Sequence, residues 1–330
     1  MSDTHMAPGV GVVLIGRNEG ARLVRSLASV TPVCDRVVYV DSGSHDDSVA
    51  AARTAGVQVV ELDPSTPFSA ARARNAGFAA LKDNPGGAPD FVQFIDGDCE
   101  LVIDWLRLAA AALRDDPDCG LVTGWRAEID RNRSVYNQMC DYEWHRPAGE
   151  ITACGGDMMV RTTAFDQTGG FDPTCIAAED GEFCFRLRKA GWRLIRLPEA
   201  MTRHDANMTR FSEWWRRTVR DGHGLAHVAT LHADFFPEQR RRAWFYGAIV
   251  PLAVLLTVPF TFGGAAAALA IYVLSWLRTA RGLHRNGLPL VEAGRHAGFF
   301  TLAKIPNVMG MMIFRWRRMR GQALRLIEYK

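Results

Sequence analysis

The chain of 330 residues is 48% hydrophobic and has a formal net charge of +3, so it can bury a large core and gives no charge argument for nucleic acid as a partner. Its seven cysteines are scattered and lack Cys-x-x-Cys spacing, which argues against a disulfide scaffold and favours reduced thiols in a cytosolic domain. The start of the chain lacks the basic and apolar regions of a signal peptide, so we expect no signal that directs it outward.

Short apolar runs alternate with longer amphipathic ones over residues 1–130, which is the pattern of βαβ units in a mainly parallel sheet. The sequence predicts strands over 10–15, 36–40, 57–62, 91–95 and 121–128, with helices near 20–30, 46–55, 69–82 and 101–114. Ligands bind such sheets beyond the carboxyl ends of the strands, where the segments GRNEG, DSGSHDD and DGDCE fall. A dinucleotide site is disfavoured, because the first strand is not followed by Gly-x-Gly-x-x-Gly.

Two carboxylates stand together in the third of these segments. Asp96 and Asp98 flank Gly97 directly after the apolar run 91–95. Residues two apart on extended backbone point to the same side, so both acids would face one small space and repel each other. A divalent cation is a common counter-charge, and oxygen ligands favour Mg²⁺ or Mn²⁺. Taken alone, these residues also fit an ordinary solvated turn.

Six segments occur in an order and spacing typical of one enzyme family. They are VVLIGRNEGARLVRSLASV, VVYVDSGSHDDS, ARARNAG, FIDGDCE, GGFD and EDGEFCFRLRKAGWRL. Over roughly residues 9–205 the chain resembles the family 2 glycosyltransferases, which have the GT-A fold. The resemblance implies an inverting hexosyltransferase that takes a sugar from a UDP- or GDP-linked donor and uses Mg²⁺ or Mn²⁺.

The resemblance also implies a set of metal ligands. Asp98 would bind the ion directly, with Asp96 close to the ribose or the metal, and Gly97 would let the backbone approach the diphosphate. His204 follows RLIRLPEAMTR at a place where many relatives have a third ligand. An isolated histidine is more often structural, so both interpretations of His204 stay open.

Nucleotide recognition is expected on the first two loops and on the segment ARARNAG. By resemblance, Arg17, Glu19 and Asp41 would contact the ribose and base, and Arg72 and Arg74 would lie against the base or diphosphate. Two alternatives stay open: a solvated helix face for the two arginines of ARARNAG, and ordinary turn use for Asp41.

The acceptor hydroxyl needs a base, and Glu179 and Asp180 stand just before a predicted amphipathic helix. By resemblance, Asp180 is the general base and Glu179 positions the acceptor or the base, so that inversion follows from one in-line displacement. A helix N-cap is the alternative for Asp180. The glycine pair 155–156 is expected to bring backbone close to the sugar, and Asp157 to contact the donor sugar.

An uncharged run covers residues 243–277. As one helix it would be about 52 Å long at roughly 1.5 Å per residue, more than a bilayer core of about 30 Å. Pro251, Pro259 and two adjacent glycines divide the run, and arginines flank both ends. The sequence therefore predicts a hairpin or re-entrant loop with both ends in the cytoplasm. A second stretch, 297–314, precedes a basic tail and is predicted to be an interfacial or re-entrant helix. A buried helical cover is the alternative.

The predicted organisation is a GT-A catalytic domain over residues 1–235 and a helical membrane region over 236–330, with the catalytic domain at the cytoplasmic face. The expected activity is metal-dependent sugar transfer to a lipid-linked or growing saccharide in cell-surface polysaccharide or glycolipid assembly. One alternative is a polyprenyl-phosphate sugar synthase. Another is an inactive nucleotide-sugar-binding scaffold at the membrane, against which the intact acids Asp96, Asp98 and Asp180 argue.

Overall fold

The computed structural model describes residues 6–257 and 263–322. They form two compact units, which divide between Asn207 and Met208. Helix α8 (Phe211–Leu231) therefore belongs to the second unit. The domain boundary that the sequence predicts after residue 235 stays a prediction.

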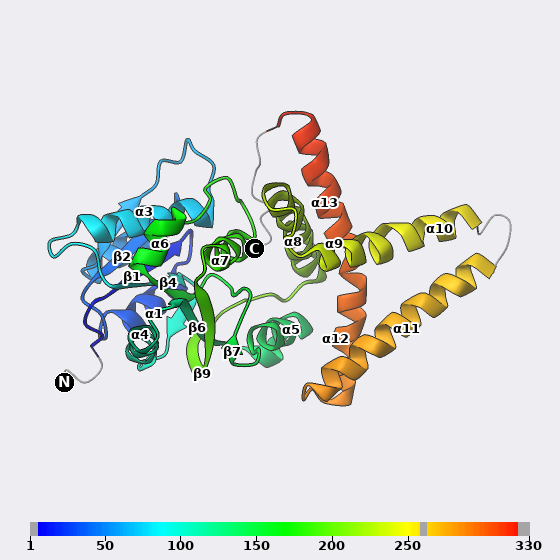
Figure 1. Ribbon diagram of the computed structural model, residues 1–330, viewed down its shortest axis with the longest axis horizontal. Coiled ribbons are helices and arrows are strands. Elements are labelled where there is room, and N and C mark those ends of the chain that lie inside the picture. The colour runs from blue at the N-terminus through cyan, green and yellow to red at the C-terminus, as the bar shows by residue number, and fades with distance from the viewer. Residues whose placement is uncertain (1–5, 258–262, 323–330) are drawn as a thin grey trace. The chain divides into compact units, whose positions relative to one another are not determined.

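The first unit is a mixed sheet flanked by helices (Figure 1). Its strand order is β3-β2-β1-β4-β8-β6-β9-β5, and β7 also pairs with β9. The strands are β1 (Val10–Gly16), β2 (Val37–Asp41), β3 (Gln58–Glu61), β4 (Phe91–Asp96), β5 (Cys99–Leu101), β6 (Cys119–Glu128), β7 (Gly149–Glu150), β8 (Met158–Arg161) and β9 (Arg193–His204). Strands β1 to β4 pair in parallel, whereas β8 runs antiparallel to both β4 and β6. The predicted α/β sheet is confirmed.

Helices cover both faces of this sheet. They are α1 (Ala21–Val30), α2 (Ser48–Thr54), α3 (Ala70–Asp83), α4 (Trp105–Asp115), α5 (Val135–Trp144), α6 (Thr162–Thr168) and α7 (Glu179–Lys189), with a short 3-10 helix, η2 (Arg131–Arg133). Figure 1 shows α1 and α4 on one side of the sheet and α3 and α6 on the other. Val12 of β1 belongs to the core on the α1 and α4 side, and Val13 to the core on the α3 side. Because both faces are buried, the central strands are continuous apolar runs rather than alternating ones.

One predicted helix begins too early. The sequence predicts a helix over 101–114, but residues Cys99–Leu101 form β5 and α4 begins at Trp105. Strand β5 pairs antiparallel with the end of β9, in the register Cys99↔His204 and Leu101↔Thr202. A strand of three residues has no periodicity of its own, so only its partner strand reveals it.

The second unit is helical. Its elements after α8 are α9 (Pro237–Trp244), the π-helix η3 (Phe245–Ile249), α10 (Val250–Thr257), α11 (Gly263–Arg285), α12 (Leu290–Leu302) and α13 (Lys304–Met319). Helices α8 and α13 pack backbone against backbone, because a Cβ atom on Gly222 would overlap the carbonyl of Asn307 and one on Gly310 would overlap that of Val219. Small residues allow this close approach.

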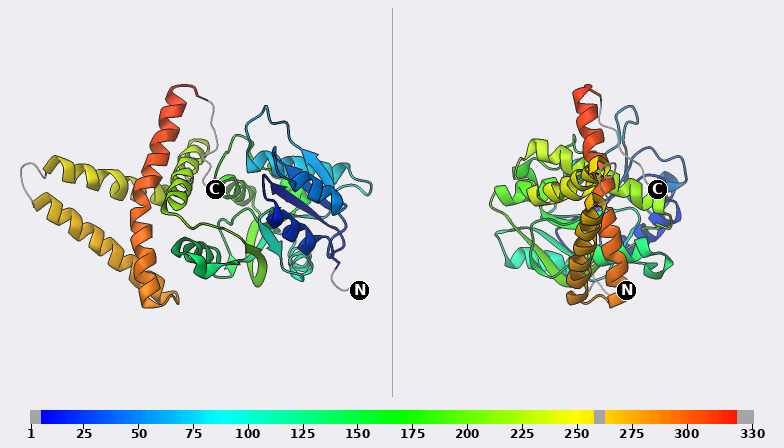
Figure 2. Two further views of the ribbon diagram at one scale, coloured as in Figure 1. Left: turned by 180° about the vertical axis from the view of Figure 1, so that it is seen from behind. Right: turned by 90° about the vertical axis from the view of Figure 1, so that its right-hand side faces the viewer.

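Helices α10 and α11 run in opposite directions, as Figures 1 and 2 show. They expose large apolar side chains, including Leu255 (71% exposed) and Leu269 (66%). Among the described residues, two helical segments, Gly263–Arg285 and Leu290–Met319, are long and apolar enough to cross a membrane. The region is therefore a candidate for membrane association, and its predicted sidedness stays a prediction.

Candidate active site

The loops that follow β1, β2 and β4 meet at the carboxyl edge of the sheet, as the sequence predicts. The backbone N–H of Asn18 donates to Oγ of Ser44 (2.9 Å), and Oδ1 of Asn18 accepts from the N–H of His45 (2.8 Å). The N–H of Gly97 donates to the carbonyl of Ile15 (2.7 Å). These contacts fix the segments GRNEG, DSGSHDD and DGDCE against one another.

Asp41 is buried and holds its own loop together. One carboxylate oxygen accepts hydrogen bonds from the backbone N–H groups of Gly43 (2.9 Å) and Ser44 (2.8 Å), and the other from the hydroxyls of Tyr39 (3.0 Å) and Ser44 (2.5 Å). Burial raises the pKa of Tyr39, and the charge of Asp41 raises it further, so the phenol stays a donor. Asp41 thus stabilises the turn that follows β2, and its contact with a nucleotide stays a prediction.

Three other predicted nucleotide contacts lie around this edge. Arg17 and Glu19 are partly buried in the loop after β1, where Glu19 forms an ion pair with Arg22 (2.8 Å). Arg72 donates to the carbonyls of Asp63 (3.0 Å) and Thr66 (3.1 Å) and so anchors the segment before α3. Their roles toward a nucleotide also stay predictions.

Arg74 is 2% exposed and lies at the centre of the site. Its Nη2 is 2.8 Å from Oδ1 of Asp96, and its Nη1 is 2.8 Å from Oε1 of Glu179. Burial alone would lower the pKa of Arg74, but the charges of Asp96 and Glu179 outweigh it and raise the pKa. The guanidinium therefore stays charged and joins the end of β4 to the start of α7. The alternative that Arg74 lies on a solvated face of its helix is therefore wrong.

Arg126 on β6 is a site residue that is not predicted from the sequence. Its Nη2 lies 2.8 Å from Oδ2 of Asp157 and 3.6 Å from Oδ2 of Asp96. Asp157 is buried and also accepts from the N–H of Asp96 (3.1 Å) and the hydroxyl of Thr202 (2.7 Å). Asp96 thus has a guanidinium on each side, so part of the repulsion between the acids is already balanced. An arginine inside a predicted strand was the available signal.

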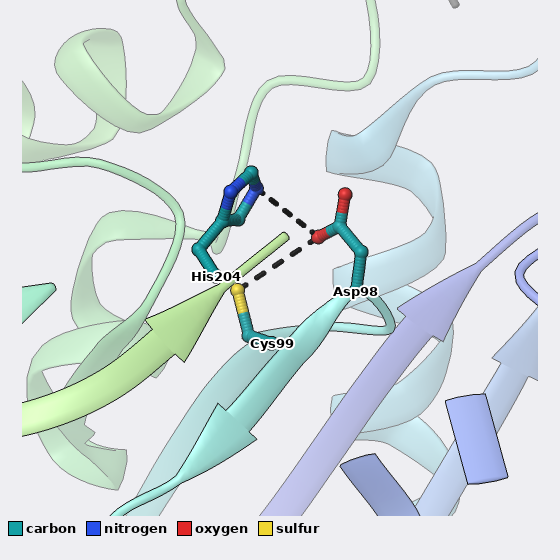
Figure 3. Close-up of side chains that lie close together, drawn as sticks. All are labelled: Asp98, Cys99 and His204. Atoms are coloured by element: carbon teal, nitrogen blue, oxygen red, sulfur yellow. Dashed lines mark hydrogen bonds and ion pairs between the residues drawn. The ribbon is translucent and has the colours of Figure 1, made fainter. Parts of the chain in front are cut away.

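Asp98, Cys99 and His204 form a second cluster, shown in Figure 3. Nε2 of His204 is 3.2 Å from Oδ1 of Asp98, and Sγ of Cys99 is 3.8 Å from the same oxygen. The β5–β9 register produces the cluster, because it places Cys99 directly opposite His204. On the other side of His204, Oε2 of Glu128 lies 3.7 Å from Nδ1.

The donor set of this cluster fits a divalent metal ion in part. One carboxylate oxygen and one imidazole nitrogen suit Mn²⁺ or Mg²⁺ when further oxygen ligands arrive with a substrate. The thiol of Cys99, whose pKa burial raises well above its ordinary value, is a softer ligand than Mg²⁺ or Mn²⁺ prefers. Asp98 and His204 are thus brought together as predicted, whereas Asp96 points to the two arginines. The predicted ligand set stays a prediction.

Asp180 lies in the first turn of α7, next to Glu179. The N-cap of α7 is Ala178, so the N-cap alternative for Asp180 is wrong. Burial, and then the charge of Glu179, raise the pKa of Asp180 to about 7, although Arg74 opposes this. A carboxylate with that pKa can accept a proton near neutral pH.

The glycine pair brings the loop before β8 onto these side chains. A Cβ atom on Gly156 would overlap the guanidinium of Arg74, whereas one on Gly155 would make only an ordinary contact of 3.9 Å with Asp180. The close backbone approach that the sequence predicts here is therefore, in this structure, an approach to Arg74.

A cleft of about 250 Å³ opens beside this arrangement. Its lining includes Arg126, Trp144, Arg146, Gly155, Asp157 and Arg196. Asp157 and Arg126 connect the cleft to Asp96, and Gly155 connects it to Asp180. The cleft is therefore lined by residues that contact Asp96 and by a glycine that lies near Asp180.

Two family models match the sequence. The model described as glycosyl transferase family group 2 matches residues 91–314, and the one described as glycosyl transferase family 2 matches residues 12–168. The match to the family group 2 model covers more than half of the chain.

Curated relatives carry related names. The chain is 28% identical over 295 residues to a pre-mycofactocin glycosyltransferase of Mycobacterium tuberculosis, with 83% of this chain and 58% of that protein covered. It is 28% identical over 326 residues to an N-acetylglucosaminyl-diphospho-decaprenol L-rhamnosyltransferase of the same species, with 86% and 98% covered. The chain thus spans little more than half the length of the first relative.

Solved structures share the fold. A mannosyltransferase from Pyrobaculum calidifontis, in complex with GDP-Man and Mn²⁺, superposes with a TM-score of 0.60 at 19% identity and covers 96% of this chain and 89% of its own. Residues 1–349 of S. aureus TarS superpose with a TM-score of 0.50 at 17% identity, covering 95% and 92%.

Proposed function

The chain belongs to glycosyltransferase family 2, and from that premise we propose that it transfers a hexosyl group from a UDP- or GDP-linked donor to a lipid-linked or growing saccharide acceptor, with inversion. The observation that carries the proposal is the buried Arg74, which holds Asp96 at the end of β4 and Glu179 beside Asp180. Arg74 thereby joins the donor-side carboxylate to the acid that stands beside the proposed acceptor-side base.

On the donor side, Asp98 and His204 would hold a divalent metal ion, Mg²⁺ or Mn²⁺. When bound, such an ion neutralises the negative charge that develops on a departing nucleoside diphosphate. The P. calidifontis mannosyltransferase, solved in complex with GDP-Man and Mn²⁺, supports this kind of donor and metal. Arg17, Glu19, Asp41 and Arg72 would line the nucleotide.

On the acceptor side, Asp180 would take the proton of the acceptor hydroxyl as the oxygen attacks the anomeric carbon. Its raised pKa is what a general base working near neutral pH requires. Glu179, fixed by Arg74, would keep Asp180 in place and keep its pKa high. A polyprenyl-phosphate acceptor would arrive already ionised and need no base, so the environment of Asp180 favours a hydroxyl acceptor.

The acceptor would be met at a membrane surface. The exposed leucines of α10 and α11 support insertion into lipid, and the arginines on both sides of the apolar run support the cytoplasmic face. The name of the second M. tuberculosis relative, which acts on a diphospho-decaprenol, supports a lipid-linked acceptor.

The proposal is tested by incubating membranes that contain the full-length protein with a panel of labelled UDP- and GDP-sugars, with and without EDTA. We expect one donor to be hydrolysed or transferred, and only when metal is present. The Asp180→Asn variant should lose transfer, whereas Asp166→Asn, which removes an exposed ion pair with Lys82, should retain it. No turnover of any donor by the wild type would support the inactive scaffold instead.

A further inference from the structure

Two arginines in the cleft have no role in the mechanism above. Arg146 lies in the segment that follows α5, and Arg196 lies on β9, where it pairs with Gly149 of β7. Both side chains line the cleft that Gly155 and Asp157 border. The fold therefore brings two positive charges from separate elements to one cleft, whose lining also includes the acid Glu143.

Neither guanidinium forms an ion pair with an acid in the part of the chain that the structure describes. Arg146 donates from Nε to the backbone carbonyl of Glu143 (3.0 Å), and its guanidinium lies 5.5 Å from the centre of the Tyr142 ring. The Nε of Arg196 is buried and has no hydrogen-bond partner. Arg74 and Arg126 differ in this respect, because both contact carboxylates at 2.8 Å.

The two charges also act on each other. Burial lowers the pKa of Arg196, and the positive charge of Arg146 lowers it further. Holding two cations together in a partly buried cleft costs free energy unless an anion offsets it. Guanidinium groups bind phosphate oxygens with directional, charge-assisted hydrogen bonds, so a phosphate ester is a fitting anion.

The position of the arginines favours the acceptor as the source of that anion. In the proposed function, the donor diphosphate lies with Asp98 and His204, which are not among the residues that line the cleft, whereas the lining residue Gly155 lies near Asp180, since a Cβ atom on it would be 3.9 Å from Oδ2 of that acid. Resting on that proposed function, we propose that Arg146 and Arg196 form an anion subsite that binds a phosphate or diphosphate group of the acceptor. The phosphate could belong to a prenyl diphosphate or to a soluble sugar phosphate, and the chemistry of recognition is the same.

A binding experiment tests the subsite without turnover. Full-length protein in detergent is titrated with inorganic pyrophosphate in the presence of EDTA, by calorimetry. We expect Arg196→Gln and Arg146→Gln each to weaken binding by about 10-fold or more, as loss of a charged hydrogen bond does. The control is Arg193→Gln, on the same strand but exposed and paired with Asp116 (2.7 Å), which should bind as the wild type does.

The Asp98→Asn variant separates the two anion sites. It should lose metal-dependent donor binding and keep pyrophosphate binding in EDTA, because the subsite is independent of the metal. If the wild type does not bind pyrophosphate, or if both arginine variants bind it as well as the wild type does, the subsite is refuted. This result stands whether or not the proposed transferase activity is found.

Turnover identifies the source of the phosphate. Transfer is compared for a short-chain prenyl diphosphate sugar, a sugar 1-phosphate and a neutral alkyl glycoside. We expect Arg196→Gln to raise KM about 10-fold or more for whichever phosphorylated acceptor is used, and to leave KM for the donor and for the neutral glycoside unchanged. A rise in the donor KM alone would overturn the assignment to the acceptor.

Discussion

Arg74 and Asp96 lie 2.8 Å apart, between Nη2 and Oδ1, although 22 residues separate them in sequence. The same guanidinium reaches Glu179, so one buried cation connects the strand that ends in Asp96 with the helix that begins beside Asp180. Because a buried charge is costly without its partners, these three side chains are interdependent. The integrity of the site can therefore be tested through Arg74.

Replacing Arg74 with Met should both destabilise the protein and abolish turnover. Removing one partner of a buried ion pair typically costs about 3 to 5 kcal/mol, and we expect about 3 here because Asp96 is partly exposed. Chemical denaturation measures the loss of stability, and a transfer assay measures the loss of turnover. The control Lys82→Met breaks an exposed pair with Asp166 and should cost less than about 1 kcal/mol. An unchanged denaturation midpoint for Arg74→Met would contradict this account.

The sequence could predict the strands and the acids, but not which groups touch. Strand ends are local features, so the runs before Gly16, Asp41 and Asp96 could be identified from composition. The contact between Asp98 and His204 depends on the β5–β9 register, which is set by pairing between segments about 100 residues apart. Hydrophobic periodicity carries no information about such a register.

The ion-pair partners of Arg126 could not be predicted from the sequence either. Its isolated position in an apolar strand was visible in the sequence, but its partners Asp157 and Asp96 come from two other strand ends. The predicted mutual repulsion of Asp96 and Asp98 assumed that no counter-charge was present. In the structure, tertiary packing provides two guanidinium groups before any ligand binds.

Turnover should require a metal ion bound by Asp98, so removing either the ion or the carboxylate should abolish it. The Asp98→Asn variant keeps the size of the side chain, so we expect a native fold, no Mn²⁺ binding and no metal-dependent donor binding. Electron paramagnetic resonance titration of Mn²⁺ with wild type and variant measures this directly. Turnover that persists in EDTA would exclude a metal from the reaction.

Turnover should rise with pH as Asp180 ionises. Because burial and Glu179 raise the pKa of Asp180 to about 7, the base is protonated at pH 5 and ionised at pH 8. We expect kcat to increase through pH 7 to a plateau, and Asp180→Asn to lower it by about 10² to 10⁴-fold. In Glu179→Gln the pKa should fall, so the rise should shift to lower pH. A flat wild-type profile between pH 5 and 8 would remove Asp180 as the base.

Stability should change with pH in the opposite direction. The pKa of Asp180 is higher in the folded state than the value of about 3.9 expected for an unfolded chain, so the folded state binds the proton more tightly. Its contribution to stability is present below pH 4 and is lost as pH rises through 7. Asp180→Asn should therefore be more stable than the wild type at pH 8, by up to about 4 kcal/mol, and nearly equal to it near pH 4. Denaturation midpoints at the two pH values measure the difference.

The two glycines before Asp157 should respond differently to alanine. Gly156→Ala would place a methyl group on the guanidinium of Arg74, so we expect turnover to fall at least about 10-fold and stability by about 1 to 3 kcal/mol. Gly155→Ala has room for its methyl group and should keep near-normal stability, which makes it the matched control. Equal stability of the two variants would show that Arg74 moves aside at little cost.

The apolar hairpin should insert into the bilayer and return to the side from which it starts. Its outgoing arm, residues 243–257, is about 22 Å long at roughly 1.5 Å per residue, which is less than a bilayer core of about 30 Å. Leu255 (71% exposed) and Leu256 (63%) of α10 are left largely uncovered by the described residues. We therefore expect 1 M salt to leave the full-length protein in the membrane fraction and detergent to release it, and the double change Leu255→Glu and Leu256→Glu to weaken the attachment.

Labelling of introduced cysteines then decides the topology. Arg242→Cys before the hairpin and Arg281→Cys after it are both exposed positions, and Arg193→Cys reports the side of the first unit. The seven native cysteines lie between residues 34 and 184, so unmodified protein gives the background. For a hairpin, an impermeant reagent added to sealed vesicles should label all three positions from the same side, because arginines flank both arms. Labelling of Arg242→Cys and Arg281→Cys from opposite sides would establish a single crossing, and release by salt alone would establish a peripheral, purely electrostatic attachment.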